Sequence, residues 1–381
     1  MQKFEPVRFS RQAPDFYSTL NKRVNQYFAD NRIDKHANGA MRFKTAFMLA
    51  LYITPFILIF TLNITSPWIM LGLCVLIGLG MAGIGLSVMH DACHGAYSKN
   101  DTVNKILGYT VNMVGANAFT WKVQHNVLHH TYTNVNELDE DISHGGILRM
   151  NPHDKWKPVH KFQHIYAWPL YGLMTIVWVF FKDFDRLISY SKRGLVDRVK
   201  ASKAQEWAIL LFSKAFYFTY IIVLPIVFLP FTWWQVLIGL GVILYISGFI
   251  LAMIFQPAHV TPDSTFPLPN KETNTLENNW AIHQLLTTKN FANKSKFFSW
   301  FIGGLNFQIE HHLFPTICHV HYKKIAPIVE YTAKQFGLPY HHDKTFLKAV
   351  YSHALSLKEF SQNTVVPQLI PVKNKEQLVE A

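Results

Sequence analysis

The stretch PWIMLGLCVLIGLGMAGIGLSVMHDACH (67–94) joins an apolar run directly to a pair of histidines. Residues 67–89 carry no charge, and about 20 such residues suffice to cross a bilayer as a helix. His90 and His94 follow at positions i and i+4, which lie on one face of a helix. The stretch therefore predicts a membrane span followed by two imidazoles that are spaced to share one metal ion, and the other histidine clusters decide whether they do.

Three further runs resemble this span in length and composition, at 43–62, 207–229 and 233–255. Only 16% of the 381 residues are charged, whereas soluble domains carry about 25%. Lys214 is the one charge inside the third run, and we expect it to extend to the membrane surface from near the end of its helix. The predicted fold class is all-α, an integral membrane protein with four transmembrane helices.

The distribution of basic residues predicts how these spans are oriented. The short links 63–66 and 230–232 contain no Lys or Arg, whereas the long segments outside the spans are rich in both. Because positive charge gathers on the cytoplasmic side, we expect two hairpins with both termini and the central segment in the cytoplasm. The stretch 162–181 is interpreted as an interfacial helix broken at Pro169 rather than as a fifth span. The stretch 104–120 is interpreted in the same way.

These features predict three parts of the chain. Residues 1–42 form a cytosolic N-terminal segment without a secretory signal, and 43–330 form the membrane domain. Residues 331–381 form a cytosolic C-terminal segment whose end is expected to be disordered. The net charge of +12 is assigned to the cytoplasmic side of the spans, so no nucleic-acid partner is expected. Small residues in GLGMAG (78–83) are interpreted as helix-packing positions rather than a dinucleotide site.

The histidines are concentrated next to the spans rather than within them. Of the 19, nine lie in 90–164 and eight in 259–342. The sequence HNVLHH places His125 and His129 on one helical face, but turns His130 away by roughly 100°. Either His130 binds a different metal, or a helix irregularity absorbs the extra residue. In QIEHH, three residues share a face again: Gln308, His311 and His312.

Candidate ligands also follow the fourth span. His259 lies at its cytoplasmic end, and His283 is the alternative, with Asn279 four residues earlier as a possible partner of a metal-bound water. One zinc takes about four ligands, so this many histidines indicate two metal ions. Two redox metals can activate O₂ and zinc cannot, which favours two non-haem irons. The acidic residues of NELDED could orient the ring nitrogens that do not bind metal: Glu137, Asp139, Glu140 and Asp141.

HDACH, HNVLHH and QIEHH resemble, in order and spacing, the three histidine boxes of the membrane fatty acid desaturase family. The resemblance covers about 40–330. With Gln308 at the first position of its third box, GGLNFQIEHHLFP (303–315) is similar to front-end desaturases and to bacterial acyl-CoA desaturases of the linoleoyl-CoA type. The resemblance implies a cytosolic helical cap with a di-iron centre. It implies eight ligands: His90, His94, His125, His129, His130, His259, His311 and His312.

The same resemblance implies a reaction and partners. The expected activity is O₂-dependent insertion of a cis double bond into a fatty acyl chain, carried on CoA or on a membrane lipid. No fused cytochrome b5 segment is recognised, so a separate donor is expected, either cytochrome b5 or a ferredoxin with a reductase. A hydroxylase, epoxygenase or ketolase of the same superfamily remains an alternative. A histidine-rich metal transporter is a further alternative, although its ligands would be expected near the membrane midplane.

Overall fold

The computed structural model describes residues 3–10, 15–143 and 146–363, and most of them are helical. The expected disorder after residue 363 lies outside the described residues. Strands are limited, in the described ranges, to two parallel pairs of two residues each. The chain forms two compact units, each assembled from stretches far apart in sequence. The first unit contains 3–5, 37–123 and 168–253, and the second contains the described residues of 6–36, 124–167 and 254–363.

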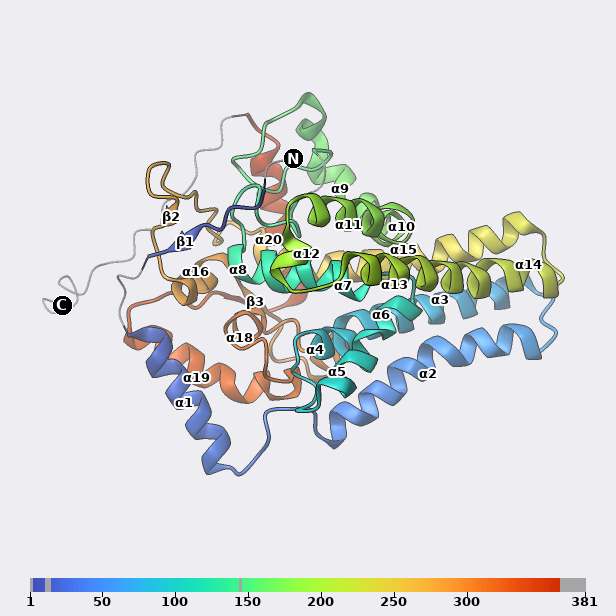
Figure 1. Ribbon diagram of the computed structural model, residues 1–381, viewed down its shortest axis with the longest axis horizontal. Coiled ribbons are helices and arrows are strands. Elements are labelled where there is room, and N and C mark those ends of the chain that lie inside the picture. The colour runs from blue at the N-terminus through green and yellow to red at the C-terminus, as the bar shows by residue number, and fades with distance from the viewer. Residues whose placement is uncertain (1–2, 11–14, 144–145, 364–381) are drawn as a thin grey trace, which may run out of the picture. The chain divides into compact units, whose positions relative to one another are not determined.

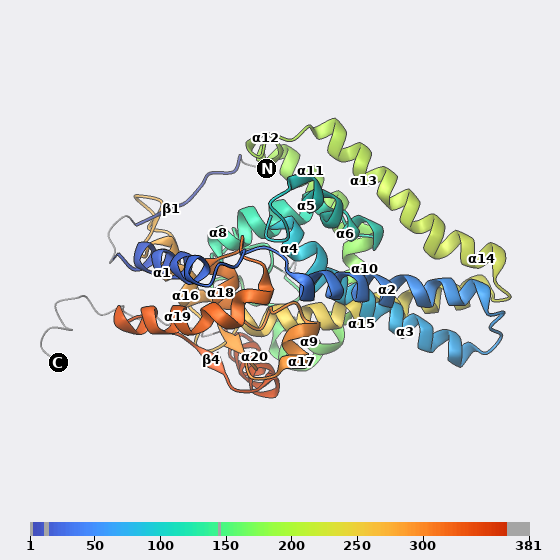
Figure 2. The same ribbon diagram turned by 90° about the horizontal axis from the view of Figure 1, so that it is seen from below.

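The first unit holds the long apolar helices (Figure 1). Four helices are long and apolar enough to cross a membrane, which confirms the four predicted spans: Gly39–Thr61, Pro67–Cys93, Lys203–Phe228 and Trp233–His259. They are α2 (Gly39–Thr61), α3 (Pro67–Gly83) with η1 (Ile84–Val88) and α4 (Met89–Cys93), α13 (Lys203–Phe218) with η5 (Thr219–Val223) and α14 (Leu224–Phe228), and α15 (Trp233–His259). Figures 1 and 2 place the α2–α3 turn and the α14–α15 turn at the same end of this unit.

Glycines in α3 allow close contact with the neighbouring helices. A Cβ atom on Gly80 would lie 2.6 Å from the backbone nitrogen of Tyr52 in α2, and one on Gly78 would lie 2.9 Å from the carbonyl oxygen of Ile243 in α15. Backbones approach this closely only where a small residue lies at the crossing. The interpretation of 78–83 as a packing segment is therefore confirmed.

The interpretation of Lys214 as a side chain that reaches the membrane surface is wrong. Its ammonium group is buried and donates to the Asp183 carboxylate at 2.8 Å and to the carbonyl oxygens of Gly115 at 2.7 Å and Val179 at 2.6 Å. Asp183 also accepts a hydrogen bond from the hydroxyl of Thr120. All three ammonium protons have acceptors, which is how a charge within a membrane helix is stabilised.

Short helices complete the first unit and include the region of the possible fifth span. They are α5 (Asp101–Gly108), α6 (Thr110–Met113), α7 (Ala118–Lys122), α10 (Met174–Val177), η4 (Trp178–Lys182), α11 (Asp183–Lys192) and α12 (Leu195–Arg198). The helices Pro158–Gly172 and Met174–Lys192 meet at a bend of 59°. The first of these helices continues through Pro169 and ends at Gly172, so the expected break at Pro169 is wrong and the bend lies after it. By length and composition the pair counts as a broken span or a re-entrant segment.

The second unit contains the second and third histidine boxes and a hydrophobic core of its own. Its elements are β1 (Arg8–Phe9), α1 (Phe16–Asp30), η2 (Val123–His129, from its second residue), α8 (His130–Tyr132), η3 (Pro158–Phe162), α9 (Gln163–Gly172, up to residue 167), the end of α15, β2 (Thr275–Leu276), α16 (Trp280–Thr287), β3 (Asn290–Phe291), α17 (Lys296–Phe301), α18 (Gln308–Leu313), η6 (His319–His321), α19 (Tyr322–Gln335), β4 (His342–Asp343) and α20 (Phe346–Phe360).

The third-box helix α18 lies inside that core. Helix α1 buries one residue per turn, at Phe16, Leu20, Val24 and Phe28, the spacing of an amphipathic helix. These side chains pack with buried residues of α16, α18 and α19. In β1–β2, Arg8 pairs with Thr275, and in β3–β4, Asn290 pairs with His342. The six-residue α18 is therefore held by its neighbours rather than by its own helical hydrogen bonds.

Candidate metal centre

The first histidine box lies in the first unit, at the end of the second span. Its helix changes to π-helical geometry at η1 immediately before the box, and such irregularities are frequent at functional sites. The ring centroids of His90 and His94 are 4.8 Å apart, as expected for one face of a helix. The Trp121 ring packs edge-on against both imidazoles, at 5.4 and 5.7 Å. The two rings therefore form a preassembled pair.

The second box lies on the π-helical segment η2, which decides between the two interpretations of HNVLHH. A π-helical turn is wider than an α-helical turn, so residues five apart come to lie on one face. The Nε2 atoms of His125 and His130 lie 3.2 Å apart, and the rings of His125 and His129 stack at 5.1 Å. A helix irregularity thus brings all three imidazoles of this box together.

Five of the predicted ligands form two converging groups within the second unit, and His125 lies beside one of them, His130. One ring nitrogen each from His129, His259 and His312 lies within 4.8 Å of the others, and the same holds for His130, His311 and His312. The Nε2 atoms of His130 and His311 are 2.9 Å apart. These residues come from three separate elements: η2 with α8, the end of α15, and α18. Tertiary packing, not local sequence, therefore assembles the cluster.

The Nδ1 atoms of these imidazoles contact polar groups that fix how the rings are oriented. The Nδ1 atom of His129 lies 3.0 Å from both carboxylate oxygens of Asp139, and that of His125 lies 2.9 Å from Asp141. The predicted contacts of NELDED with histidine ring nitrogens are therefore present for these two aspartates. For Glu137 and Glu140 this role stays a prediction.

Three further groups contact Nδ1 atoms of the clustered histidines and were not predicted from the sequence. His312 Nδ1 lies 2.8 Å from the amide oxygen of Gln284. His259 Nδ1 lies 3.2 Å from the carbonyl oxygen of Thr287, and His311 Nδ1 lies 3.2 Å from the hydroxyl of Tyr322. Metal-binding histidines usually have such a contact at the second nitrogen, which fixes the tautomer and leaves Nε2 for the metal.

The carboxylates also shape the electrostatics of the cluster. Burial lowers the pKa of His129, but the charges of Asp139 and Asp141 outweigh it and raise this pKa to about 9. Burial dominates at His125 and lowers its pKa, although Asp141 opposes the shift. The buried negative charge would partly balance the positive charge of bound metal ions.

The residues that the sequence left as alternatives have distinct surroundings. His283 lies in α16, where its ring packs edge-on against Phe9 at 5.4 Å, and burial lowers its pKa to about 4. The side chain of Asn279 caps α16 by accepting a hydrogen bond from the backbone nitrogen of Ile282 at 2.9 Å. Gln308 is buried as the first residue of α18. In the described ranges, His283 does not belong to any of the groups of converging ring nitrogens, and the roles expected of Gln308 and Asn279 stay predictions.

Glu310, between Gln308 and the two histidines, makes hydrogen bonds that hold α18 in place. Its carboxylate accepts hydrogen bonds from Asn290 at 2.8 Å and from the Tyr340 hydroxyl at 2.9 Å. Asn290 also accepts from the backbone nitrogen of Ile309. These contacts tie the back of α18 to β3 and to the chain that leads into β4.

The donor set fits a transition-metal ion. The cluster offers imidazole nitrogens, which suit iron, copper, nickel and zinc. Within the described part of the chain, the buried Nε2 of His259 has no hydrogen-bond partner. An unsatisfied buried polar atom is unfavourable unless a ligand pairs with it.

Comparison with known proteins agrees with this site. Residues 66–344 match the family described as fatty acid desaturase. The chain belongs to the fatty acid desaturase family. It is an oxidoreductase with the apolar helices of an integral membrane protein.

Several curated desaturases are similar along most of their length. An sn-1 linoleoyl-lipid 6-desaturase of Synechocystis sp. is 35% identical over 350 residues, which cover 92% of this chain and 96% of the relative. An acyl-lipid (8-3)-desaturase of Physcomitrium patens is 37% identical, over 91% of this chain and 71% of the relative. A desaturase of the same name from Mortierella alpina is 32% identical, over 90% and 77%.

Proposed function

We propose that this desaturase inserts a cis double bond into the acyl chain of a membrane lipid, on the carboxyl side of an existing double bond. The convergence of His129, His259 and His312, from three separate elements, is the observation that carries the proposal. The names of the relatives, a 6-desaturase and two (8-3)-desaturases of acyl lipids, support this type of substrate and position. An acyl-CoA is the alternative carrier.

We further propose that eight histidines hold two irons. They are His90, His94, His125, His129, His130, His259, His311 and His312. Bound iron would supply the activation of O₂ that removal of two hydrogens from adjacent methylenes requires. Two electrons, two protons and these two hydrogens reduce O₂ to two waters. Cytochrome b5, or a ferredoxin with its reductase, is the proposed electron donor.

The protein's own residues contribute orientation and exclusion of water. Asp139, Asp141 and Gln284 hold ring nitrogens in place, which presents Nε2 to a metal. Burial of the cluster excludes solvent from a reactive centre. Because methylenes are chemically alike, the position of the acyl chain decides which bond is oxidised. The charge distribution supports a site and termini on the cytoplasmic side.

Product analysis in a host that makes no polyunsaturated fatty acids tests the proposal. Cells expressing the full chain and fed linoleic acid should form a fatty acid with one additional cis double bond, detected by gas chromatography with mass spectrometry. Product should disappear without O₂ and in His312→Ala, but persist in His342→Ala, an exposed histidine in β4. A hydroxylated product, or desaturation that persists in His312→Ala, would contradict the proposal.

A further inference from the structure

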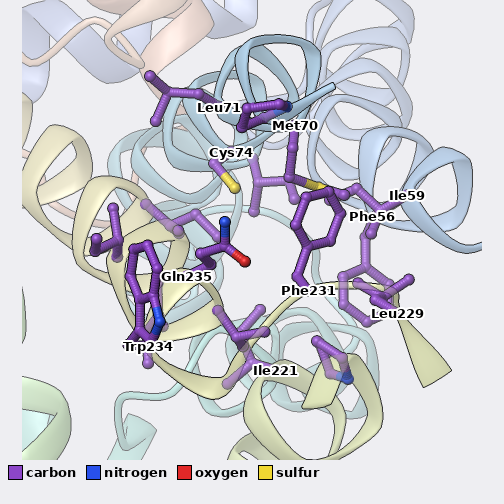
Figure 3. A pocket seen from close by; sticks show the side chains of 18 of the residues that line it. Phe56, Ile59, Met70, Leu71, Cys74, Ile221, Leu229, Phe231, Trp234 and Gln235 are labelled. Carbon is purple, nitrogen blue, oxygen red and sulfur yellow. The ribbon is translucent and has the colours of Figure 1, made fainter. Parts of the chain in front are cut away.

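An apolar cavity lies in the first unit, at the end where the spans turn. It is a cavity of about 330 Å³ between the end of α2, the start of α3, the end of α14 and the start of α15. Figure 3 shows the side chains around it, with Cys74 and Gln235 among those directed inward. The lining includes Phe56, Leu71, Cys74, Ile221, Phe231 and Trp234.

The lining indicates a hydrocarbon ligand. Nearly all of these side chains are aliphatic or aromatic. The amide oxygen of Gln235 accepts hydrogen bonds from the backbone and the hydroxyl of Thr232, both at 2.9 Å, and so belongs to the start of α15. A polar ligand would lose most of its hydration here and find few hydrogen-bonding groups to replace it.

The position indicates where such a ligand comes from. Trp68 and Trp233 are 79% and 63% exposed near the two turns, and tryptophans concentrate where a membrane meets water. Ile77, which also lines the cavity, precedes His90 by 13 residues on one continuous helical path, or about 20 Å along the axis. The cavity therefore belongs to the leaflet on the side of the turns, away from the first histidine box.

The shape of a hydrocarbon chain suits this cavity. Such a chain is narrow and flexible, so it can follow an apolar space between helices and contact the aliphatic and aromatic side chains that line it. We propose that this cavity binds the acyl chain of a phospholipid from the leaflet on the side of the turns, a lipid distinct from the one that is desaturated. This inference rests on the membrane-spanning helices and not on the proposed reaction.

Photocrosslinking in vesicles tests this inference. The full chain is reconstituted in phosphatidylcholine containing a small fraction of phosphatidylcholine with a diazirine at the end of one acyl chain. After irradiation, mass spectrometry should find lipid adducts enriched on peptides that carry the lining residues. Phe212, which is 74% exposed on α13 and does not line the cavity, reports general contact with bulk lipid.

Variants at the cavity separate specific binding from general contact. Cys74→Phe places a ring in the cavity and should remove the lining adducts, whereas adducts at Phe212 and those of Cys74→Ala should persist. If Cys74→Phe does not insert into membranes, Leu71→Trp should give the same loss. Lining adducts that persist in both filled variants, adducts no more frequent than at Phe212, or cross-links to a second copy of the chain would overturn the inference.

Discussion

Replacing Asp139 by Asn should weaken metal binding strongly, because this carboxylate holds the His129 ring in position. Both of its oxygens lie 3.0 Å from Nδ1 of His129. They also accept hydrogen bonds from the backbone nitrogens of Asn134 at 2.8 Å and Asp141 at 2.9 Å. The amide of an asparagine side chain at this position would replace one acceptor by a donor that faces these N–H groups. Loss of such a partner typically lowers metal affinity about 10–100-fold.

The burial of the two aspartates predicts an order of effects. The Asp139 side chain is 0% exposed, whereas that of Asp141 is 24% exposed. Water can therefore replace part of the hydrogen bonding that Asp141→Asn removes. Asp139→Asn should therefore lower the affinity more than Asp141→Asn does.

Anaerobic titration of the metal-free protein with Fe(II), or with Co(II) followed by absorbance, measures these affinities. Asp197→Asn is the matched control, since Asp197 is 64% exposed and pairs with Lys203 in the first unit. Equal affinities for Asp139→Asn and the control would refute the assigned role of Asp139.

Three further substitutions probe the packing, with thermal or denaturant unfolding in detergent as the measurement. Lys214→Met leaves the Asp183 carboxylate buried without its cation and should destabilise the fold by about 3–5 kcal/mol, most of which the double substitution Asp183→Leu/Lys214→Met should restore; an unaffected single variant would contradict the buried pair. Gly80→Ala should cost roughly 1–3 kcal/mol through overpacking, unlike Gly72→Ala, where a Cβ atom meets nothing within 4 Å; equal stabilities would argue against the α2–α3 contact. Tyr340→Phe removes a hydrogen bond to the buried carboxylate of the third box and should cost about 1–3 kcal/mol; no change would exclude that bond as a stabilising contact.

The sequence predicts those parts of the molecule that depend on one short stretch. The spans follow from uninterrupted apolar runs, and the pairing of His90 with His94 follows from helical spacing. The role of Asp139 and Asp141 follows from acidic residues close to a histidine box. In these cases, the relevant contacts lie within one helix or between residues close together in the sequence.

Features that depend on distant contacts could not be predicted in this way. Hydropathy does not reveal which helical face Lys214 occupies, and its partner Asp183 lies 31 residues earlier. Gln284 and Tyr322 are single polar residues in otherwise ordinary helices, so no spacing distinguishes them. From the sequence of HNVLHH alone, either a separate metal for His130 or a helix irregularity was possible. Only the π-helical backbone of the structure decides between them. The division into two interleaved units also depends on long-range packing.

The central claim is that separate parts of the chain supply imidazoles to a shared pair of irons. Iron X-ray absorption combined with metal analysis of the anaerobically reconstituted protein tests it most directly. We predict two irons per chain with first-shell nitrogen scattering typical of imidazole, and loss of iron in His259→Ala but not in His342→Ala. Iron absent from the reconstituted protein, or bound without imidazole ligands, would contradict the claim.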